Sequence, residues 1–274
     1  MDWLDPVKRY KGGNTLVFLI RQRLFGALLA FAMMPAVQAD TMRLAADIWY
    51  PYNGEPSSDY PGYMVELATE ILQDADHELD YLLMPWSRSL LEARKGNIDC
   101  VVGAFRGDAP DFLYPKVSMG RDDVAFFALA ENRGWQFSSV ASLNGVRVAV
   151  ISGYSYGDEL NAYIKRNRRS PNLQITTGNA PLERNISLLQ AKRVELLVAS
   201  PNVMNATLKR SGQEGKVVEV GRMHTPDDLY IACSPNLKSS EYYVRLLGEG
   251  VERLRADGRL HKILERYGLV DWQQ

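Results

Sequence analysis

The stretch PWSRSLLEARKGNIDCVVGAFR, Pro85–Arg106, decides the fold, because a helix, its stop and a buried strand follow one another in it. Leucine and alanine side chains within 90–93 give the helix an apolar stripe, and Gly96 supplies the left-handed conformation that ends a helix. The compact apolar run 98–103 then predicts a strand buried on both faces. Open α/β sheets bind ligands beyond the carboxyl ends of their strands, so we expect a ligand near 103–106.

The composition indicates a globular α/β protein with room for two lobes. The chain has 274 residues, of which 46% are hydrophobic and 24% charged, and this length supports a sizeable core. Its formal net charge is −1, so no basic surplus points to nucleic acid, and we expect no nucleic-acid partner.

The N-terminus has the layout of a cleavable secretory signal. Two arginines precede the apolar run 24–37, and small residues occupy positions −3 and −1 of a cleavage point after Ala39. The run is shorter than the roughly 20 residues that span a bilayer, although an uncleaved anchor is the alternative. Residues 1–20 carry two acidic side chains, which suggests a start assigned too far upstream. We therefore expect a signal peptide at 1–39 and a periplasmic location.

The remaining chain predicts two similar α/β sets. Between 42 and 103 the order is strand, helix, strand, helix, strand, which is typical of a mainly parallel sheet. A polar patch at 131–134 precedes a second set, and the apolar run 229–233 predicts a returning strand. We expect a first lobe of 40–130 with 229–274 and a second lobe of 131–228, joined by two strands. Ligands bind between such lobes, and hinge closure follows from having few crossings.

Four short motifs occur in order along the chain, at Gly62–Ala68, Trp86 with Lys95–Asp99, Leu143–Val150 and Arg255–Ile263. Together they resemble the extracellular solute-binding proteins of the amino-acid (family 3) type, which serve ABC transporters. The resemblance implies the two-lobed periplasmic-binding-protein fold (type II), with two mixed sheets flanked by helices and joined by two hinge strands. It also implies a monomer that captures a small solute for an ABC-type membrane permease, without catalysis, cofactor or metal.

The chain departs from that family where the ligand's charged ends are held. The place of the family's carboxylate-gripping arginine is taken by Ala109 or Pro110, and Ser200 occupies the place of its ammonium-binding aspartate. Because such clamps match their ligands closely, these changes argue against an ordinary zwitterionic amino acid. Arg106 or Arg88 could replace the lost arginine, since guanidinium grips carboxylate or phosphate.

The candidate ligand-binding residues follow the predicted strand ends. Aromatic side chains there are typical of pocket walls, and free backbone N–H groups at a helix start form an anion site. Simple packing of the aromatic residues, solvation of the arginines and N-capping by Ser155 are the alternatives. We expect a small polar solute, either anionic or stacked on aromatic rings, to contact Trp49, Tyr52, Trp86, Arg88, Arg106, Ser152, Gly153, Tyr154 and Ser155.

The chain has two cysteines and carries no recognisable catalytic motif. Cys100 and Cys233 both lie in apolar strand-like runs, and they are either a disulfide or two buried thiols. No nucleophile elbow or metal-ligand spacing accompanies the histidines, so no enzyme is expected. The alternatives are a ligand sensor for a membrane signalling partner and a dehydratase-like periplasmic enzyme on the same fold.

Overall fold

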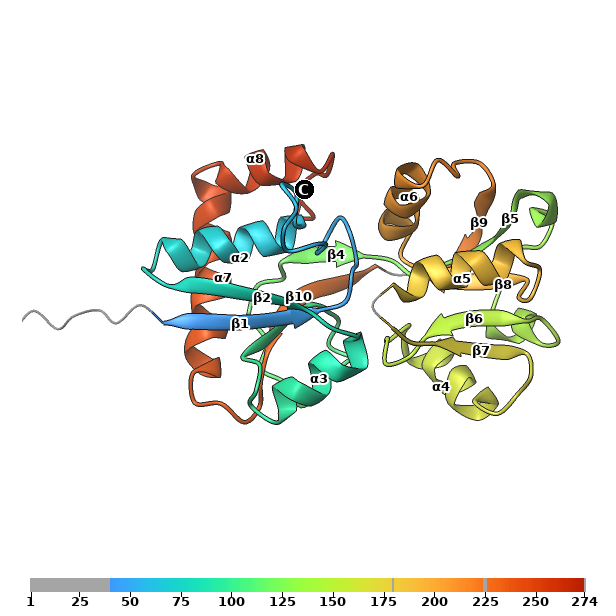
Figure 1. The fold of residues 1–274 in the computed structure, drawn as a ribbon, viewed down its shortest axis with the longest axis horizontal. Helices are drawn as coiled ribbons and strands as arrows, with labels where there is room; N and C mark the ends of the chain where they lie inside the picture. Colours follow the sequence, from blue (N-terminus) through green and yellow to red (C-terminus); the bar gives the residue numbers. More distant parts are fainter. Residues whose placement is uncertain (1–39, 179, 224–225, 274) are drawn as a thin grey trace, which may run out of the picture. The chain divides into compact units, whose positions relative to one another are not determined.

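A computed structural model describes residues 40–178, 180–223 and 226–273, which belong to one structural unit. The signal peptide predicted at 1–39 and its cleavage point lie outside the described residues. Two five-stranded sheets, each with its own helices, form the fold (Figure 1). We call the first sheet with its helices the first lobe and the second sheet with its helices the second lobe.

The first sheet has the strand order β2-β1-β3-β10-β4. β1 pairs in parallel with β2 and β3, whereas β10 is antiparallel to both β3 and β4. In Figure 1, helix α3 lies on the opposite side of these strands from α2 and α8. The elements are β1 (Thr41–Ala46), α2 (Tyr63–Gln73), β2 (Glu78–Leu83), α3 (Trp86–Arg94), β3 (Cys100–Ala104), β4 (Gly120–Asp122), β10 (Asp227–Cys233), α7 (Ser240–Ala256) and α8 (Arg259–Arg266).

The second sheet has the strand order β7-β6-β8-β5-β9. β6 is parallel to β7 and β8, and β5 is antiparallel to β8 and β9. The elements are β5 (Ala125–Leu129), two short 3-10 helices (Ala130–Asn132 and Val140–Leu143), β6 (Val148–Ile151), α4 (Asp158–Asn167), β7 (Leu173–Thr176), α5 (Pro181–Gln190), β8 (Leu196–Ala199), α6 (Pro201–Arg210) and β9 (Val217–Arg222).

The chain passes from one sheet to the other twice, after β4 and after β9. The boundary predicted at 130/131 placed the strand 125–129 in the first lobe, but its pairing with β8 and β9 places it in the second. The polar patch that suggested the boundary is a 3-10 turn inside the second lobe. Nothing in the apolar run itself marks the crossing, because a buried strand has the same composition in either sheet.

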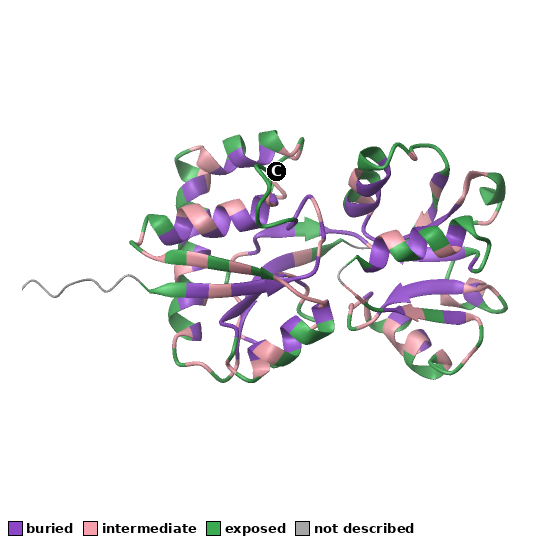
Figure 2. Cartoon of the chain, viewed as in Figure 1, coloured by how far each residue is buried: buried purple, intermediate pink, exposed green. Residues whose placement is uncertain are grey.

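The opening stretch folds into the predicted helix and strand. Gly96 follows α3 with a φ of 78°, a conformation that glycine adopts without steric cost. Leu90 and Ala93 are buried but Leu91 is 49% exposed, because neighbouring positions on a helix point about 100° apart. The central strands of both sheets are largely buried (Figure 2). Among the described residues, the helices include none of the length and apolarity that a membrane crossing requires.

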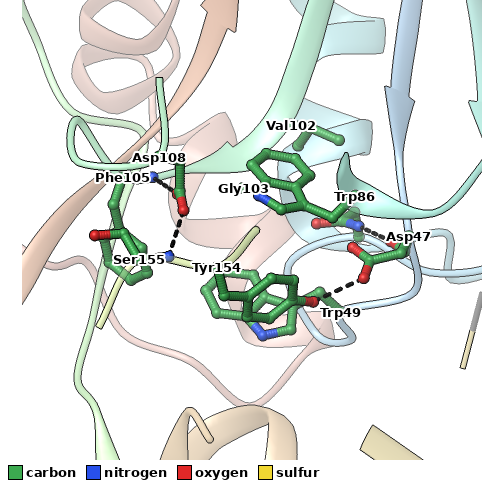
Figure 3. A pocket seen from close by; sticks show the side chains of 10 residues that line it. Asp47, Trp49, Trp86, Val102, Gly103, Phe105, Asp108, Tyr154 and Ser155 are labelled. Atoms are coloured by element: carbon green, nitrogen blue, oxygen red, sulfur yellow. Dashed lines mark hydrogen bonds between the residues drawn. The ribbon is translucent and has the colours of Figure 1, made fainter. Parts of the chain in front are cut away.

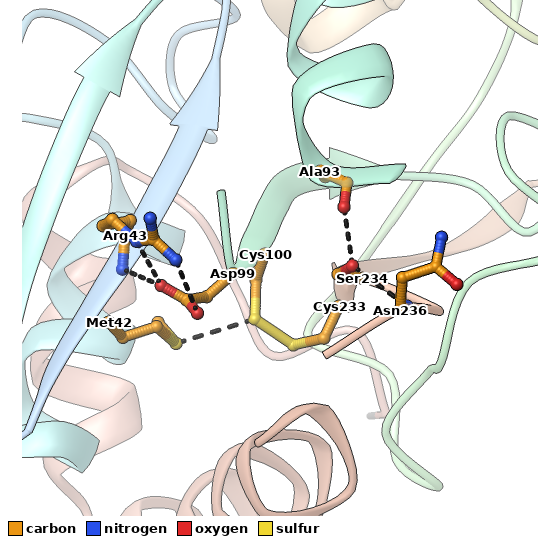
Figure 4. The surroundings of a disulfide bond; sticks show 8 residues. All are labelled: Met42, Arg43, Ala93, Asp99, Cys100, Cys233, Ser234 and Asn236. Atoms are coloured by element: carbon orange, nitrogen blue, oxygen red, sulfur yellow. Dashed lines mark hydrogen bonds and ion pairs between the residues drawn. A yellow bond between two sulfur atoms is a disulfide. The ribbon is translucent and has the colours of Figure 1, made fainter. Parts of the chain in front are cut away.

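Cys100 of β3 and Cys233 of β10 form a disulfide between directly opposed positions of the first sheet (Figure 4). Both cysteines are completely buried, and the sulfur of Met42 lies 3.7 Å from the Cys100 sulfur. Beside the disulfide, the Ser234 hydroxyl donates a 2.6 Å hydrogen bond to the carbonyl of Ala93, which ties the end of α3 to the end of β10. The bridge therefore fastens the returning strand to the middle of the first lobe.

Candidate functional site

A small cavity lies where the carboxyl ends of β1 and β3 meet the loop that follows β6 (Figure 3). Its volume is about 20 Å³, which is room for about one water molecule. The first lobe supplies most of its wall, and the second lobe closes it with two residues of the β6–α4 loop. The lining residues are Asp47, Trp49, Asn53, Trp86, Val102, Gly103, Phe105, Asp108, Tyr154 and Ser155.

Two carboxyl groups of the first lobe face this cavity. Asp47 directly follows β1 and is only 2% exposed, and Asp108 lies in the loop after β3. Removal of water around the carboxyl raises the pKa of each aspartate to about 7, because burial disfavours the charged form. Among the described residues that line the cavity, none is lysine, arginine or histidine.

The second lobe binds both carboxyl groups directly. The Tyr154 hydroxyl donates a 2.9 Å hydrogen bond to Asp47, and the Ser155 backbone N–H donates a 2.6 Å hydrogen bond to Asp108. The other oxygen of Asp108 accepts a 2.8 Å bond from the backbone N–H of Phe105. The β6–α4 loop therefore binds the first lobe through these two acids (Figure 3).

Aromatic rings from both lobes surround the acids. Trp49 meets the edge of Phe105 with ring centroids 6.0 Å apart, and Trp86 meets the edge of Tyr154 at 6.3 Å. Two buried polar atoms of the lining, Trp86 Nε1 and Asn53 Oδ1, have no hydrogen-bond partner among the described residues. Because buried polar groups are nearly always paired, these two atoms have unused bonding capacity next to the cavity.

Two glycines permit the close approaches around the cavity. Gly103 has a φ of +82°, and a Cβ there would lie 3.0 Å from Asn53 Oδ1. Gly153, in the β6–α4 loop, has a φ of +83°, and a Cβ there would lie 2.8 Å from the Ser87 hydroxyl oxygen. Ser87 also donates a 3.1 Å hydrogen bond to the carbonyl of Ser152. The first turn of α3 and this loop are thus in direct contact across the two lobes.

Four of the predicted binding residues line the cavity, namely Trp49, Trp86, Tyr154 and Ser155. Ser152 and Gly153 lie beside it, in contact with Ser87 rather than in its wall.

Tyr52 lies behind Trp49, with the two rings stacked at 4.5 Å. Its hydroxyl accepts a 2.9 Å hydrogen bond from Asn202 of the second lobe and donates to the carbonyl of Arg121. Tyr52 therefore contributes to a contact between the lobes near the crossing after β4, not to the cavity.

The two arginines expected to hold an anionic solute do not line the cavity. Arg88 is exposed on α3, and the structure gives it no ion pair within the described ranges. Arg106 is exposed and lies over the rings of Tyr114 and Tyr230, at 4.8 and 4.6 Å. Cation–π attraction to two rings holds this guanidinium over Tyr114 and Tyr230, in a neighbouring hollow of about 340 Å³ that shares Phe105 and Ser155 with the cavity.

Sequence reasoning missed the two acids and Asn53. Asp47 ends the first predicted strand, so the strand-end rule that selected Trp49 could have selected it as well. Asp108 lies two residues after Arg106, in the loop where the resembled family has its arginine. That family's charge pattern favours a basic side chain in this loop, so the sequence does not predict a pocket lined by acids.

No protein-family model matches the sequence, and no curated protein matches it. Several solved structures share its fold. A histidine kinase sensor domain described as similar to periplasmic binding proteins is 17% identical, with a TM-score of 0.69 over 84% of this chain and 96% of that chain. An ancestral arginine-binding protein bound to glutamine is 17% identical, with a TM-score of 0.66 over 83% of this chain and 97% of that chain.

A third similar structure is the substrate-binding protein of an ABC uptake transporter from Streptococcus pneumoniae with bound histidine. It is 15% identical, with a TM-score of 0.67 over 83% of this chain and 92% of that chain. The TM-scores of these three structures show a shared fold. The chain therefore has the predicted two-lobed α/β fold of periplasmic binding proteins, with two mixed sheets flanked by helices.

Proposed function

We propose that the chain is a solute-binding protein that closes its two lobes around a small molecule. The observation that carries this proposal is the pair of hydrogen bonds across the cavity, from Tyr154 to Asp47 and from Ser155 to Asp108. Two lobes connected by two crossings can rotate about those crossings. The loop after β6 then acts as the part of the second lobe that seals the cavity.

A solute enters this site only when the lobes separate. The cavity of about 20 Å³ has room for about one water molecule, and both carboxyl groups are bonded to the second lobe. Opening would break these two bonds and expose the wall formed by Trp49 and Trp86. A bound solute must therefore contribute enough contacts to bring the lobes back together around it.

We propose that the signal at 1–39 exports the protein to the periplasm, where it delivers its solute to an ABC-type permease. The similar structures include a substrate-binding protein of an ABC uptake transporter, which supports a transport role. A small-molecule partner, a membrane permease and a monomeric chain follow from this proposal.

A ligand sensor for a membrane signalling partner is the second candidate. The histidine kinase sensor domain with the same fold favours it. Deletion of the gene separates the two roles. Loss of uptake of the radiolabelled solute identifies transport, whereas intact uptake with loss of the transcriptional response to that solute identifies sensing.

Solute binding is tested by thermal shift of the chain beginning at Asp40 against a metabolite panel. A ligand at a hundredfold excess over its Kd stabilises the folded state by about 2.7 kcal/mol, so a true ligand raises the melting temperature. Mass spectrometry of the solute after its release should show it unchanged. If no solute raises the melting temperature the proposal is wrong, and if the solute is converted the protein is an enzyme.

A further inference from the structure

The charge of the cavity wall is one-sided. Asp47 and Asp108 contribute two carboxyl groups, and the lining residues described above include no basic side chain. Arg106, the nearest arginine along the loop, is held over Tyr114 and Tyr230. A carboxylate or phosphate on the solute would therefore face two acids without a guanidinium or ammonium to balance it, which is strongly unfavourable in a buried site.

The remaining hydrogen-bonding capacity combines one buried donor, Trp86 Nε1, with the acceptor oxygens of Asn53 and the two carboxyl groups. The side-chain nitrogen of Asn53 donates a 2.6 Å hydrogen bond to the backbone carbonyl of Asp47. This bond fixes the amide group, so the side-chain oxygen of Asn53 points away from that carbonyl. That oxygen is buried and lacks a partner within the part of the chain that the structure describes. A solute with N–H groups could satisfy it together with the carboxylates, because ammonium and guanidinium groups are donors only.

The aromatic residues of the wall favour the same chemistry. Trp49, Trp86, Phe105 and Tyr154 all line the cavity (Figure 3). The face of an aromatic ring is negative, so these rings attract cations, and the attraction grows when water is excluded. Acids and rings together form a wall that suits a positive group, whereas a negative one would find a single unpaired donor, Trp86 Nε1, beside two acids.

We propose that the solute is a compact organic cation bearing N–H groups, an amine or a guanidinium compound, and that it carries no carboxylate. This inference rests on the proposed function, since it names the class of solute that the closing lobes capture. It replaces the expectation of an anionic solute, which depended on Arg88 and Arg106 reaching the site.

Matched pairs of compounds that differ by one carboxylate give the sharpest test. Agmatine is arginine without its carboxylate, and putrescine and cadaverine bear the same relation to ornithine and lysine. By isothermal titration calorimetry with the chain from Asp40, we expect at least one amine to bind at least about tenfold more tightly than its amino acid, which is a difference of about 1.4 kcal/mol.

The possible outcomes distinguish the two proposals. Equal or tighter binding of the amino acid in every pair, or stabilisation by succinate or phosphate instead, would overturn the cation inference and leave solute binding intact. No stabilisation by any compound of the amine, amino-acid and anion sets would contradict both proposals.

Variants test whether the acids contact the bound amine. Asp47→Asn and Asp108→Asn each keep the shape of the side chain and remove its charge, so each should weaken binding of the preferred amine by at least about tenfold. Arg88→Gln, on the exposed face of α3, is the matched control and should bind as the unmodified chain does. Unchanged affinity in both folded asparagine variants would overturn the inference.

Proton release gives a readout that needs no variant. Each carboxyl has a pKa of about 7 in the structure, and a bound cation stabilises its ionised form. Amine binding at pH 7, measured calorimetrically in two buffers of different ionisation enthalpy, should therefore release protons. Binding without proton release would contradict direct contact between the cation and these acids.

Discussion

Two aspartates of the first lobe, Asp47 and Asp108, have buried carboxyl groups that accept hydrogen bonds from the second lobe. Loss of water around the carboxyl groups of Asp47 and Asp108 raises the pKa of each, and Tyr154 and Ser155 offset part of this cost by donating hydrogen bonds. Each pKa unit corresponds to about 1.36 kcal/mol between the two protonation states. These acids therefore make the ligand-free cavity sensitive to pH.

The stability of the ligand-free protein should fall as the pH rises from about 4 to about 7. Burial raises the pKa of Asp47, Asp108 and Asp122 to about 7, so the folded state binds protons that the unfolded chain has already released. The groups facing Asp47 are Tyr154, Asp108 and Glu183, and none of them is basic.

Urea unfolding at pH 5 and pH 8 measures this effect. We expect the free energy of unfolding to be lower at pH 8 by about 2–3 kcal/mol for each of the three carboxyl groups, and Asp47→Asn, which removes one of them, should reduce the difference by about one third. A free energy of unfolding that stays constant or rises between the two pH values would contradict the account.

The rule that ligands lie beyond strand ends selected four of the ten residues that line the cavity. It selected Trp49, Trp86 and the β6–α4 loop, because it depends only on where apolar runs stop. It could not predict that Arg106 lies over two rings, since Tyr114 follows eight residues later in a loop and Tyr230 belongs to a strand far along the chain. The direction of an exposed side chain is decided by tertiary neighbours, which a single sequence does not show.

Among the elements, the β6–α4 loop and α3 are in direct contact through Ser87 and Ser152, and we propose that this contact forms when the lobes close. Gly153→Ala would add a Cβ beside the Ser87 hydroxyl at a residue with a φ of +83°. We expect the variant to bind its solute about tenfold more weakly, because the loop would be held away from the first lobe. Calorimetry of the variant measures the loss.

Gly157→Ala is the matched control for this substitution. Gly157 has a φ of +84°, and a Cβ there would meet no atom within 4 Å, so the backbone strain is similar but the lobe contact is unaffected. The affinity of Gly157→Ala should stay close to that of the unmodified chain. If both variants lose affinity equally, backbone strain rather than closure explains the effect.

The disulfide between β3 and β10 should stabilise the fold without affecting the site. It closes a loop with a sequence separation of 133 residues, and the loss of such a bridge costs about 2–5 kcal/mol. In the double variant Cys100→Ala with Cys233→Ala, the free energy of unfolding should be lower by that amount, and the midpoint of urea unfolding should move to a lower concentration. Its solute affinity should change less than about twofold, since the cavity lies at the other end of β3. An unchanged free energy of unfolding would contradict this prediction.

Elements were easier to predict than their assignment to a lobe. The helix and strand within Pro85–Arg106 follow from local periodicity and a glycine stop, which act over a few residues. The strand β5 was assigned to the wrong sheet, because its partners β8 and β9 lie far along the chain. The pairing of Cys100 with Cys233 depends on β3 and β10 lying side by side, and strand pairing between distant segments does not show in a single sequence.

In the described unit as a whole, the two lobes are in contact at two places, near the crossing after β4 and at the cavity. Near the crossing after β4, Asn202 of the second lobe donates hydrogen bonds to the Tyr52 hydroxyl at 2.9 Å and to Asp122 at 3.3 Å. At the cavity, Tyr154 and Ser155 make the corresponding contacts. Rotation about the crossings would break or form these contacts together, which couples solute capture to the relative position of the lobes.

We propose that the β6–α4 loop encloses a small cationic solute between the lobes. The most direct test is a crystal structure of the chain from Asp40 with the amine that stabilises it most. We expect the amine to lie between Trp49 and Trp86, with its N–H groups on Asp47 and Asp108 in place of the bonds from Tyr154 and Ser155, and with the β6–α4 loop on its far side. An amine bound elsewhere, or a solute whose carboxylate occupies this cavity, would contradict it.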